Sequence, residues 1–231
     1  MDKINITHNG DNTDIYIYSN NDFISVQIRL SQTFYEIGLL SFLKDHFRHQ
    51  KNILDIGANI GNHSLFFAKY FDFNHIYAFE PIAQNRELYK KNLVNYEDKY
   101  TLFEYALSDK VGIKTLYNNG SLENHGGYSL SKEEGSILID EGINVNCLDN
   151  YNLTDITLIK MDVENHEKEV LLGGKETILR NKPMIVLENN HYYFSHIFPD
   201  PNPHASILSE WGYERVYMNV EYSSMDIWVV K

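Results

Sequence analysis

The sequence is poor in several features that would each point to a particular class of protein. It has one cysteine, Cys147, among 231 residues, so no internal disulfide can form and no cysteine spacing matches a zinc site. We interpret Cys147 as a small hydrophobic residue within a strand. No apolar run reaches the roughly 18 to 20 residues that span a bilayer, and the first residues lack the layout of a signal peptide. We therefore expect a protein without a membrane span that resides in the cytoplasm.

Positive charge is also scarce, with 20 Lys and Arg against 32 Asp and Glu and a formal net charge of -12. Binding along a nucleic-acid backbone needs clustered basic side chains that release counterions, so nucleic acid is not an expected partner. The acidic balance does not exclude a small nucleotide-linked substrate, because one local basic group could hold it. No low-complexity stretch divides the chain, and 43% hydrophobic content is enough for one large core. We predict a single domain over residues 1–231, with an N-terminal β extension at 1–30 and a catalytic core at 31–231.

The most informative stretch that is present runs from Ile53 to Gly61, with the sequence Ile-Leu-Asp-Ile-Gly-Ala-Asn-Ile-Gly. A short apolar strand there leads into a turn with two glycines and then into a helical stretch. We expect Gly57 and Gly61 to let the backbone pass close to a bound cofactor, where a β-carbon would clash. The spacing is G-x-x-x-G, whereas the dinucleotide fingerprint is G-x-G-x-x-G. The turn therefore favours a cofactor without phosphates over a dinucleotide such as NAD.

Strands and helices alternate from about residue 37, which is typical of an α/β protein whose parallel sheet is covered by helices on both faces. Before that point, residues 14–18 and 23–28 flank the turn-forming stretch 19–22, and this pattern predicts an N-terminal hairpin. Residues 117–146 are too polar for a core, so we predict a functional loop there. The expected core elements are strands at 52–56, 75–79, 100–105, 157–161 and 184–187, helices at 36–47, 63–70, 82–93 and 167–179, and a final antiparallel pair at 213–218 and 227–230.

Two stretches that follow predicted strands suit an adenosine. Glu80 ends one strand and lies 25 positions after Asp55, where a carboxylate can accept hydrogen bonds from both ribose hydroxyls. After the next strand, the small Ala106 would let an adenine ring approach, and Ser108 or Asp109 could bond its exocyclic amine. A Ser-Asp pair is also a common turn, which is the alternative interpretation of the second stretch.

Ionisable side chains gather at the ends of two further strands. Asp162, Glu164 and His166 alternate after the strand at 157–161, and in an extended conformation they would project toward one side. Glu188 ends the following strand in the same way, and open α/β sheets bind ligands at this edge. The pair Asp162 and Glu188 has three uses that the sequence leaves open: sharing a proton, holding substrate hydroxyls, or binding a divalent metal ion through hard oxygen ligands.

Five segments, in order along the chain, resemble the FkbM-type S-adenosylmethionine-dependent methyltransferases. They are Asp55–Gly61, Phe79–Pro81, Ala106–Asp109, Ile159–Glu167 and Val186–Glu188. The resemblance implies a class I methyltransferase fold, which is Rossmann-like with a seven-stranded, mostly parallel sheet and an antiparallel final hairpin. It also implies O-methylation of a hydroxyl, often on a sugar or a polyketide-like natural product. One departure is Asn165, where the family usually has glycine; asparagine tolerates positive φ, so we expect the turn to survive.

The resemblance also implies which residues bind S-adenosylmethionine: the glycine turn at its methionine portion, Glu80 at the ribose, and the stretch after the third strand at the adenine. Together with neighbouring positions, the expected cofactor residues are Glu36, Asp55, Gly57, Asn59, Gly61, Asn62, Glu80, Pro81, Ala106, Leu107, Ser108 and Asp162. For catalysis we expect His166 as the base, oriented by Asp162 or Glu164. Glu188 and Asp162 would bind substrate hydroxyls or a metal ion.

The leading hypothesis is methyl transfer to a hydroxyl of a sugar or nucleotide-sugar. Three alternatives stay open: an N-methyltransferase acting on a small amine or phosphoramidate, a non-catalytic partner that only binds the cofactor, and an NAD-dependent enzyme, which the glycine spacing disfavours. No stretch of the sequence identifies the acceptor among small molecules, nucleotide-sugars and glycans. The aromatic stretch at 192–198 suits either a wall of the acceptor site or the interface of a homo-oligomer.

Overall fold

Seven strands form a central sheet in the order β12-β13-β11-β10-β3-β4-β5. The structure, a computed structural model, describes residues 1–118, 124–189, 203–217 and 223–231. Neighbouring strands from β11 to β5 pair in parallel, whereas β13 is antiparallel to both of its neighbours. The prediction of a mostly parallel, seven-stranded sheet with an antiparallel final pair is confirmed.

The elements have the following bounds. The central strands are β3 (Asn52–Ile56), β4 (His75–Phe79), β5 (Tyr100–Phe103), β10 (Ile156–Met161), β11 (Met184–Glu188), β12 (Tyr213–Tyr217) and β13 (Met225–Val230). The remaining strands are β1 (Asp2–His8), β2 (Asp11–Ile17), β6 (Ala106–Leu107), β7 (Gly112–Asn118), β8 (Tyr128–Ser129) and β9 (Ile137–Asn146). The α-helices are α1 (Phe23–Ser31), α2 (Ile37–Phe47), α3 (Asn62–Tyr70), α4 (Ala83–Asn92), α5 (Glu167–Gly173), α6 (Lys175–Asn181) and α7 (Pro203–Glu210), and short 3-10 turns are η1 (Val94–Lys99), η2 (His125–Gly127) and η3 (Leu148–Tyr151).

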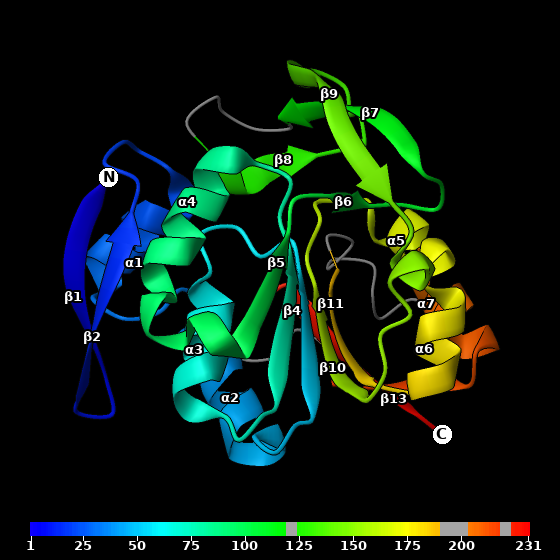
Figure 1. Cartoon of the computed structure of the whole chain (residues 1–231), viewed down its shortest axis with the longest axis horizontal. Helices are drawn as coiled ribbons and strands as arrows, with labels where there is room; N and C mark the ends of the chain where they lie inside the picture. Colours follow the sequence, from blue (N-terminus) through cyan, green and yellow to red (C-terminus); the bar gives the residue numbers. More distant parts are fainter. Residues whose placement is uncertain (119–123, 190–202, 218–222) are drawn as a thin grey trace.

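Helices cover both faces of the central sheet, with α2, α3 and α4 on one side and α5, α6 and α7 on the other (Figure 1). Alternate strand residues supply the two cores: Ile53 and Ile76 pack toward the first group, and Leu54 and Ile159 toward the second. All four side chains are fully buried, which stabilises the fold by roughly 1.5–3 kcal/mol for each. Burial on both faces explains why these strands are apolar throughout instead of alternating.

The N-terminal hairpin forms, but from strands that start earlier than predicted. β1 and β2 pair around Asn9 and Gly10, whose φ angles of 50° and 80° are both positive. An Asn-Gly pair is the strongest short signal for such a turn. The hairpin therefore turns at this pair and not at the polar stretch 19–22, where the turn was predicted. Residues 23–28, expected as the second strand, instead lie in α1. Asp22 begins that helix, because its carboxylate accepts a hydrogen bond from the Ser25 amide at 3.0 Å.

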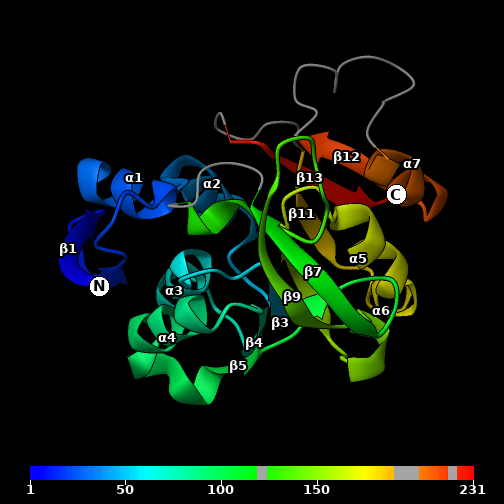
Figure 2. The same cartoon turned by 90° about the horizontal axis from the view of Figure 1, so that it is seen from above.

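The stretch 117–146, expected as a polar loop, instead forms most of a second sheet with the order β6-β9-β7-β8. β7 and β9 make an antiparallel ribbon that lies across one end of the central sheet (Figures 1 and 2). The loop prediction is wrong. The sequence suggested a loop because this ribbon is largely exposed to solvent: along β9 the buried residues are Ile143 and Val145. A strand that meets water on most of its surface can be polar without losing its ladder of main-chain hydrogen bonds.

Smaller differences concern single elements. The helix predicted at 167–179 is divided into α5 and α6 at Gly173 and Gly174, where glycine weakens helical propensity. Cys147 comes directly after the last residue of β9, so it does not lie within a strand as predicted. Its side chain is half-buried. The aromatic stretch at 192–198 falls outside the described residues. Among the helices of the described ranges, none is long and apolar enough to cross a membrane.

Candidate active site

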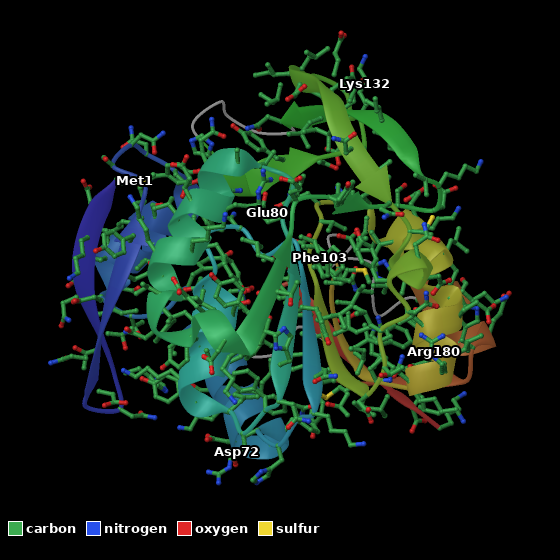
Figure 3. The ribbon with its side chains drawn as sticks, in the orientation of Figure 1. Met1, Asp72, Glu80, Phe103, Lys132 and Arg180 are labelled. Atoms are coloured by element: carbon green, nitrogen blue, oxygen red, sulfur yellow. The ribbon has the colours of Figure 1, made fainter. Side chains whose placement is uncertain are left out.

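A cavity of about 370 Å³ lies where β3, β4, β10 and β11 end, beneath the second sheet. Glu80, labelled in Figure 3, lies at this end of the central sheet, and Asp72 marks the opposite end. A cavity of this size suits a small-molecule ligand. The N-terminal residues, the central sheet and the second sheet all contribute to its wall, including Phe23, Tyr35, Glu36, Asn59, Glu80, Ala106, His125, Lys160, Asp162, Glu164 and Glu188.

The two glycines of the turn after β3 are required by the packing of the protein itself. Gly57 and Gly61 have positive φ angles of 76° and 83°. A β-carbon at Gly57 would lie 1.8 Å from the main-chain oxygen of Asp162, and one at Gly61 would lie 2.8 Å from side-chain atoms of Leu93 and Tyr89. Packing alone therefore requires glycine at both positions, and the expectation that these glycines also make room for a cofactor stays a prediction. Gly57 still lines the cavity, whereas Gly61 caps α3 against α4.

Glu80 presents a buried carboxylate to the cavity, at the point predicted for a ribose. Its Oε2 accepts a hydrogen bond from the Asn59 amide and its Oε1 accepts one from the Ile82 amide, both at 2.8 Å. Burial raises the pKa of this carboxyl, and the two amide hydrogen bonds oppose the rise. A carboxylate oxygen can accept a second hydrogen bond, so the group can still bind ligand hydroxyls. Glu80 thus joins the turns after β3 and β4, and Pro81 lines the cavity beside it.

The stretch predicted to contact adenine is divided between the cavity and the interior. Ala106 and Leu107 line the cavity. Ser108 is fully buried, and its Oγ lies 3.0 Å from Nε2 of His166 and accepts a hydrogen bond from Nζ of Lys114 at 2.7 Å. The expected bond from Ser108 to an adenine amine does not fit this arrangement, because the hydroxyl is already bonded within the protein. Ser108 instead positions His166.

Lys160, which was not among the predicted site residues, is the centre of a buried ion-pair cluster. Its side chain is 2% exposed, and its Nζ donates to the main-chain oxygen of Gly57 at 2.9 Å. The same Nζ lies 3.6 Å from carboxylate oxygens of Asp55 and Asp162. Burial would lower the pKa of Lys160, but the nearby carboxylates outweigh it and the net shift is upward. Asp55, expected at the methionine portion of the cofactor, is itself fully buried and also bonded to Ser64 at 2.6 Å.

The residues before α2 border the cavity next to this cluster. Glu36 has a φ of 54°, and its Oε2 lies 3.1 Å from Nε2 of His63. Asn62 fixes the neighbouring main chain of Tyr35, accepting from its amide at 3.0 Å and donating to its carbonyl at 3.1 Å. Glu36 and Asn62, both predicted from the sequence, therefore line the cavity and hold this segment in place.

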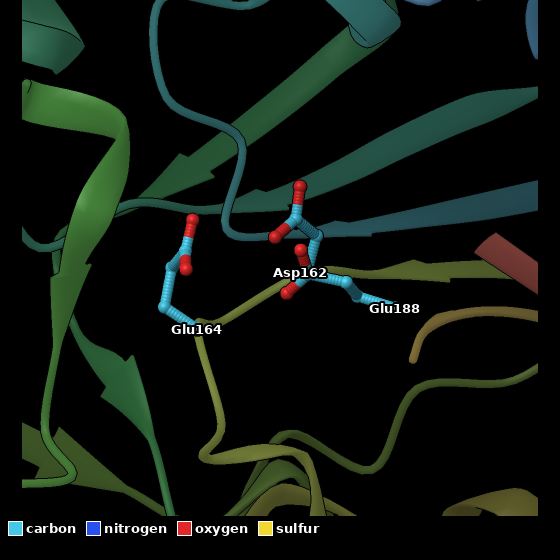
Figure 4. Close-up of side chains that lie close together, drawn as sticks. All are labelled: Asp162, Glu164 and Glu188. Atoms are coloured by element: carbon cyan, nitrogen blue, oxygen red, sulfur yellow. The ribbon is translucent and has the colours of Figure 1, made fainter. Parts of the chain in front are cut away.

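Three carboxylates meet at the ends of β10 and β11 (Figure 4). One oxygen each of Asp162, Glu164 and Glu188 lies within 4.8 Å of the other two. Burial, together with the charge of Asp162, raises the pKa of Glu164 to about 8 and that of Glu188 well above its ordinary value. Like charges this close cannot all be ionised, so the cluster holds at least one proton near neutral pH.

His166 is held by the second sheet. Its Nδ1 lies 3.1 Å from Oγ of Ser131, and its Nε2 lies 3.0 Å from Oγ of Ser108 and 3.3 Å from Nζ of Lys114. Burial and the positive charge of Lys114 lower the pKa of His166 to about 4, so the ring is neutral at pH 7. The expectation that carboxylates of the cluster orient the ring is wrong, because the hydrogen-bond partners that the described residues supply come from segments around β6, β7 and β8.

The turn between the carboxylates and His166 is left-handed at two positions. Glu164 has a φ of 54° and Asn165 a φ of 70°. The positive φ expected at Asn165 is confirmed, whereas the extended alternation expected over 162–166 does not form. Ser129 Oγ donates to the carbonyl of Glu164, and Ser131 Oγ donates to that of Asn165 at 3.0 Å. The second sheet therefore holds the turn that carries Glu164.

Comparison with known proteins places this chain in a family. The methyltransferase FkbM domain matches residues 55–215, which include most of the central sheet and much of the cavity wall. The chain therefore belongs to the FkbM family of S-adenosylmethionine-dependent methyltransferases, as the sequence motifs predicted.

Two relatives match part of the chain. The 2-O-methyltransferase NoeI of Sinorhizobium fredii is 29% identical over 146 residues, covering 56% of this chain and 60% of that protein. The AMB antimetabolite synthetase AmbE of Pseudomonas aeruginosa is 27% identical over 173 residues, covering 59% of this chain and 8% of the synthetase. Both matches span less than two thirds of the relative's own length.

Solved structures share the fold. Methyltransferase FkbM from Methylobacillus flagellatus KT has a TM-score of 0.55 at 17% identity, covering 88% of this chain and 52% of that one. A Methanococcus maripaludis protein assigned to the S-adenosylmethionine-dependent methyltransferases has a TM-score of 0.50 at 13% identity, covering 94% of this chain and 96% of that one. At these identities the likeness shows the fold alone, and it agrees with the predicted Rossmann-like architecture.

Proposed function

We propose that the chain transfers a methyl group from S-adenosylmethionine to a hydroxyl of a sugar or nucleotide-sugar. The observation that carries the proposal is the cavity itself, which has a buried carboxylate directly after β4, Glu80, where we expect the ribose, and three further carboxylates at the ends of β10 and β11, where we expect the acceptor. The relative NoeI is a 2-O-methyltransferase, which supports oxygen as the acceptor atom.

The charge of the cavity wall suits S-adenosylmethionine better than a dinucleotide. Among the described lining residues, the one lysine or arginine is Lys160, and it is already paired with carboxylates. The pyrophosphate of NAD would find no free basic partner there, whereas carboxylates stabilise the sulfonium and ammonium cations of S-adenosylmethionine. In this arrangement Glu80 would hold the ribose, Ala106 would border the adenine, and Glu36 and Asp162 would face the cationic end.

We infer that Glu164, in place of the predicted His166, takes the proton from the acceptor. Both ring nitrogens of His166 lie within hydrogen-bond distance of protein groups, and a pKa of about 4 makes the ring a weak base. Glu164 lines the cavity, and a pKa of about 8 makes its carboxylate a stronger base near neutral pH. When bound, S-adenosylmethionine supplies a methyl group that is already electrophilic. Glu164 would accept the proton of the acceptor hydroxyl as that oxygen takes up the methyl group, with S-adenosylhomocysteine as the second product.

Asp162 and Glu188 have two uses in this scheme. They can accept hydrogen bonds from acceptor hydroxyls, or they can supply the hard oxygen ligands that a divalent cation prefers. Treatment of the enzyme with EDTA, followed by addition of Mg²⁺, separates the two uses. If turnover is lost with EDTA and recovered with Mg²⁺, the cluster binds a cation. If turnover does not change, these carboxylates bind the hydroxyls of the acceptor.

The cofactor assignment is tested by binding of S-adenosylhomocysteine and of NAD, measured by calorimetry and by thermal shift. We expect S-adenosylhomocysteine to bind and raise the melting temperature, and NAD to do neither. Glu80→Gln should weaken S-adenosylhomocysteine binding by about 10- to 100-fold, because hydrogen bonds to a charged acceptor contribute roughly 1.5–3 kcal/mol. Glu87→Gln, an exposed position on α4, is the matched control and should leave affinity unchanged. Binding of NAD without S-adenosylhomocysteine would overturn the proposal.

A further inference from the structure

An aromatic side chain stands at the edge of the cavity where solvent reaches it. Phe23, the first residue of α1, lines the cavity and is nevertheless 49% exposed. Its ring packs edge-to-face against Tyr35, with centroids 6.1 Å apart and an interplanar angle of 81°. Apolar rings that border a cavity provide flat contact area for a ligand. The Phe23–Tyr35 pair is therefore a candidate platform for the acceptor.

The platform is held in place from both sides. Asp22, which caps α1, accepts a hydrogen bond from the main-chain amide of His125 at 2.9 Å, and His125 stacks on Tyr18 with ring centroids 4.2 Å apart. Tyr35 is fixed through its main chain by Asn62. Because these contacts fix the segments that carry the two rings, little ordering cost would accompany binding on them.

Tyr35 also connects the platform with the reactive end of the cavity. Burial raises the pKa of its hydroxyl, and the charges of Glu36, Asp162, Glu188 and Glu164 raise it further. The ring therefore lies within electrostatic reach of the three carboxylates that we assign to the acceptor. A ligand on the platform would place its polar groups toward those carboxylates.

The cavity wall is unsuited to phosphate. Its described residues include five carboxylates, those of Glu36, Glu80, Asp162, Glu164 and Glu188, and Lys160 is enclosed by its own partners. Residues 119–123, 190–202 and 218–222, which the structure does not describe, contain no lysine or arginine in the sequence. Recognition of a phosphate or pyrophosphate beside the reacting hydroxyl needs such side chains, or a divalent cation on the carboxylates, for which the EDTA treatment tests.

We propose that the acceptor is an uncharged sugar residue without phosphate. Its apolar face would lie on the exposed ring of Phe23, Tyr35 would border it at nearly a right angle, and its hydroxyls would bond to Glu164 and Glu188. The inference rests on the proposed function, and it narrows the acceptor by excluding nucleotide-sugars and sugar phosphates.

The first test is a panel of matched acceptors, assayed with S-adenosylmethionine that carries a radiolabelled methyl group. Methyl glycosides of hexoses and deoxyhexoses, and short neutral oligosaccharides, are compared with the 1-phosphates and nucleotide-linked forms of the same sugars. Methylation confined to the neutral members supports the inference. Preference for phosphorylated or nucleotide-linked members overturns it. If no member is methylated although the protein binds S-adenosylhomocysteine, the sugar acceptor is overturned and the cofactor assignment stays intact. If the protein does not bind S-adenosylhomocysteine, the proposed function itself is overturned.

The second test addresses the platform with the best neutral acceptor of the panel. Phe23→Ala should raise the KM for the acceptor by about tenfold, while kcat and the affinity for S-adenosylhomocysteine stay near wild type. Phe23→Trp should keep a low KM, because it retains an aromatic face. Leu30→Ala is the matched control, since Leu30 lies on the same helix, is 75% exposed and is not part of the described cavity wall. Equal KM values for wild type and Phe23→Ala, in proteins of equal melting temperature, would remove the platform from acceptor binding.

Discussion

The two ends of the cavity are built in different ways. At the end where we propose that the cofactor binds, which we call the cofactor end, Glu80 joins the turns that directly follow the neighbouring strands β3 and β4. At the end where we propose that the acceptor binds, which we call the acceptor end, Glu164 lies on a left-handed turn whose carbonyl is held by Ser129, which is 35 residues away in the chain. Phe23 comes from still further away, in the N-terminal helix. The comparison teaches that local sequence sets the cofactor end, whereas long-range contacts set the acceptor end.

The largest effect should come from the acceptor end, through Glu164. Glu164→Gln should lower kcat by about 10²- to 10⁴-fold without changing the affinity for S-adenosylhomocysteine. A base acts only when it is deprotonated, and kcat/KM reports the groups of the free enzyme, so kcat/KM of the wild-type enzyme should rise with pH and level off above a midpoint near 8, the pKa of Glu164. If His166 were the base, its pKa of about 4 would leave kcat/KM flat from pH 6 to 9. A flat profile, or full activity in Glu164→Gln, would contradict our assignment.

The next effect should come from the packing of the cofactor end. Gly57→Ala should reduce the free energy of unfolding by about 3 kcal/mol or more, because the new β-carbon would overlap the carbonyl of Asp162 at a positive φ. Gly135→Ala is the matched control: its φ is also positive, at 85°, but no atom lies within 4 Å of the added carbon. The control should therefore lose only about 1–2 kcal/mol. Denaturant unfolding measures both values, and equal losses would show that φ strain alone acts at Gly57.

The smallest effect should come from the contacts that support the acceptor end. Ser131→Ala removes the hydroxyl that bonds to the carbonyl of Asn165 and lies beside Nδ1 of His166. We expect kcat to fall by about fivefold, since a net hydrogen bond contributes roughly 1 kcal/mol, while S-adenosylhomocysteine binds as before. Ser209→Ala, at an exposed position on α7, serves as the control. A loss of cofactor affinity in Ser131→Ala would mean that the two ends of the cavity are not independent.

Some structural features that the sequence prediction missed have a recognisable signal in the local sequence. Asn9-Gly10 is a hairpin turn in its own right, and Asp22 three residues before Ser25 is a helix cap. Lys160 also carried a signal, because a lysine between Ile159 and Met161 of a buried strand must find a partner. One partner, Asp162, lies two residues further along the chain, but the other was not readable, since Asp55 reaches Lys160 from the neighbouring strand β3.

Other differences could not be read from the sequence at all. The ribbon of β7 and β9 has few buried residues, so its pattern does not differ from that of a solvated loop. The segments around β6, β7 and β8 determine the surroundings of His166, which the sequence predicted as a base and whose two ring nitrogens both lie within hydrogen-bond distance of protein groups. The packing that requires glycine at position 57 was also not readable, because the atom that a β-carbon would strike belongs to Asp162, far away in the chain.

The sequence by itself determined the family, the central sheet, the positions of its strands and the place of Glu80, the carboxylate that lines the cavity directly after β4. These follow from short-range patterns: buried parallel strands are continuously apolar, and their ends carry the polar residues. Only the tertiary structure decided which groups stay ionised, which histidine nitrogens are occupied, and where an aromatic ring meets the cavity. Those properties depend on burial and on distances between residues far apart in the chain, and a protonation state changes with each charge that packing brings within a few ångströms.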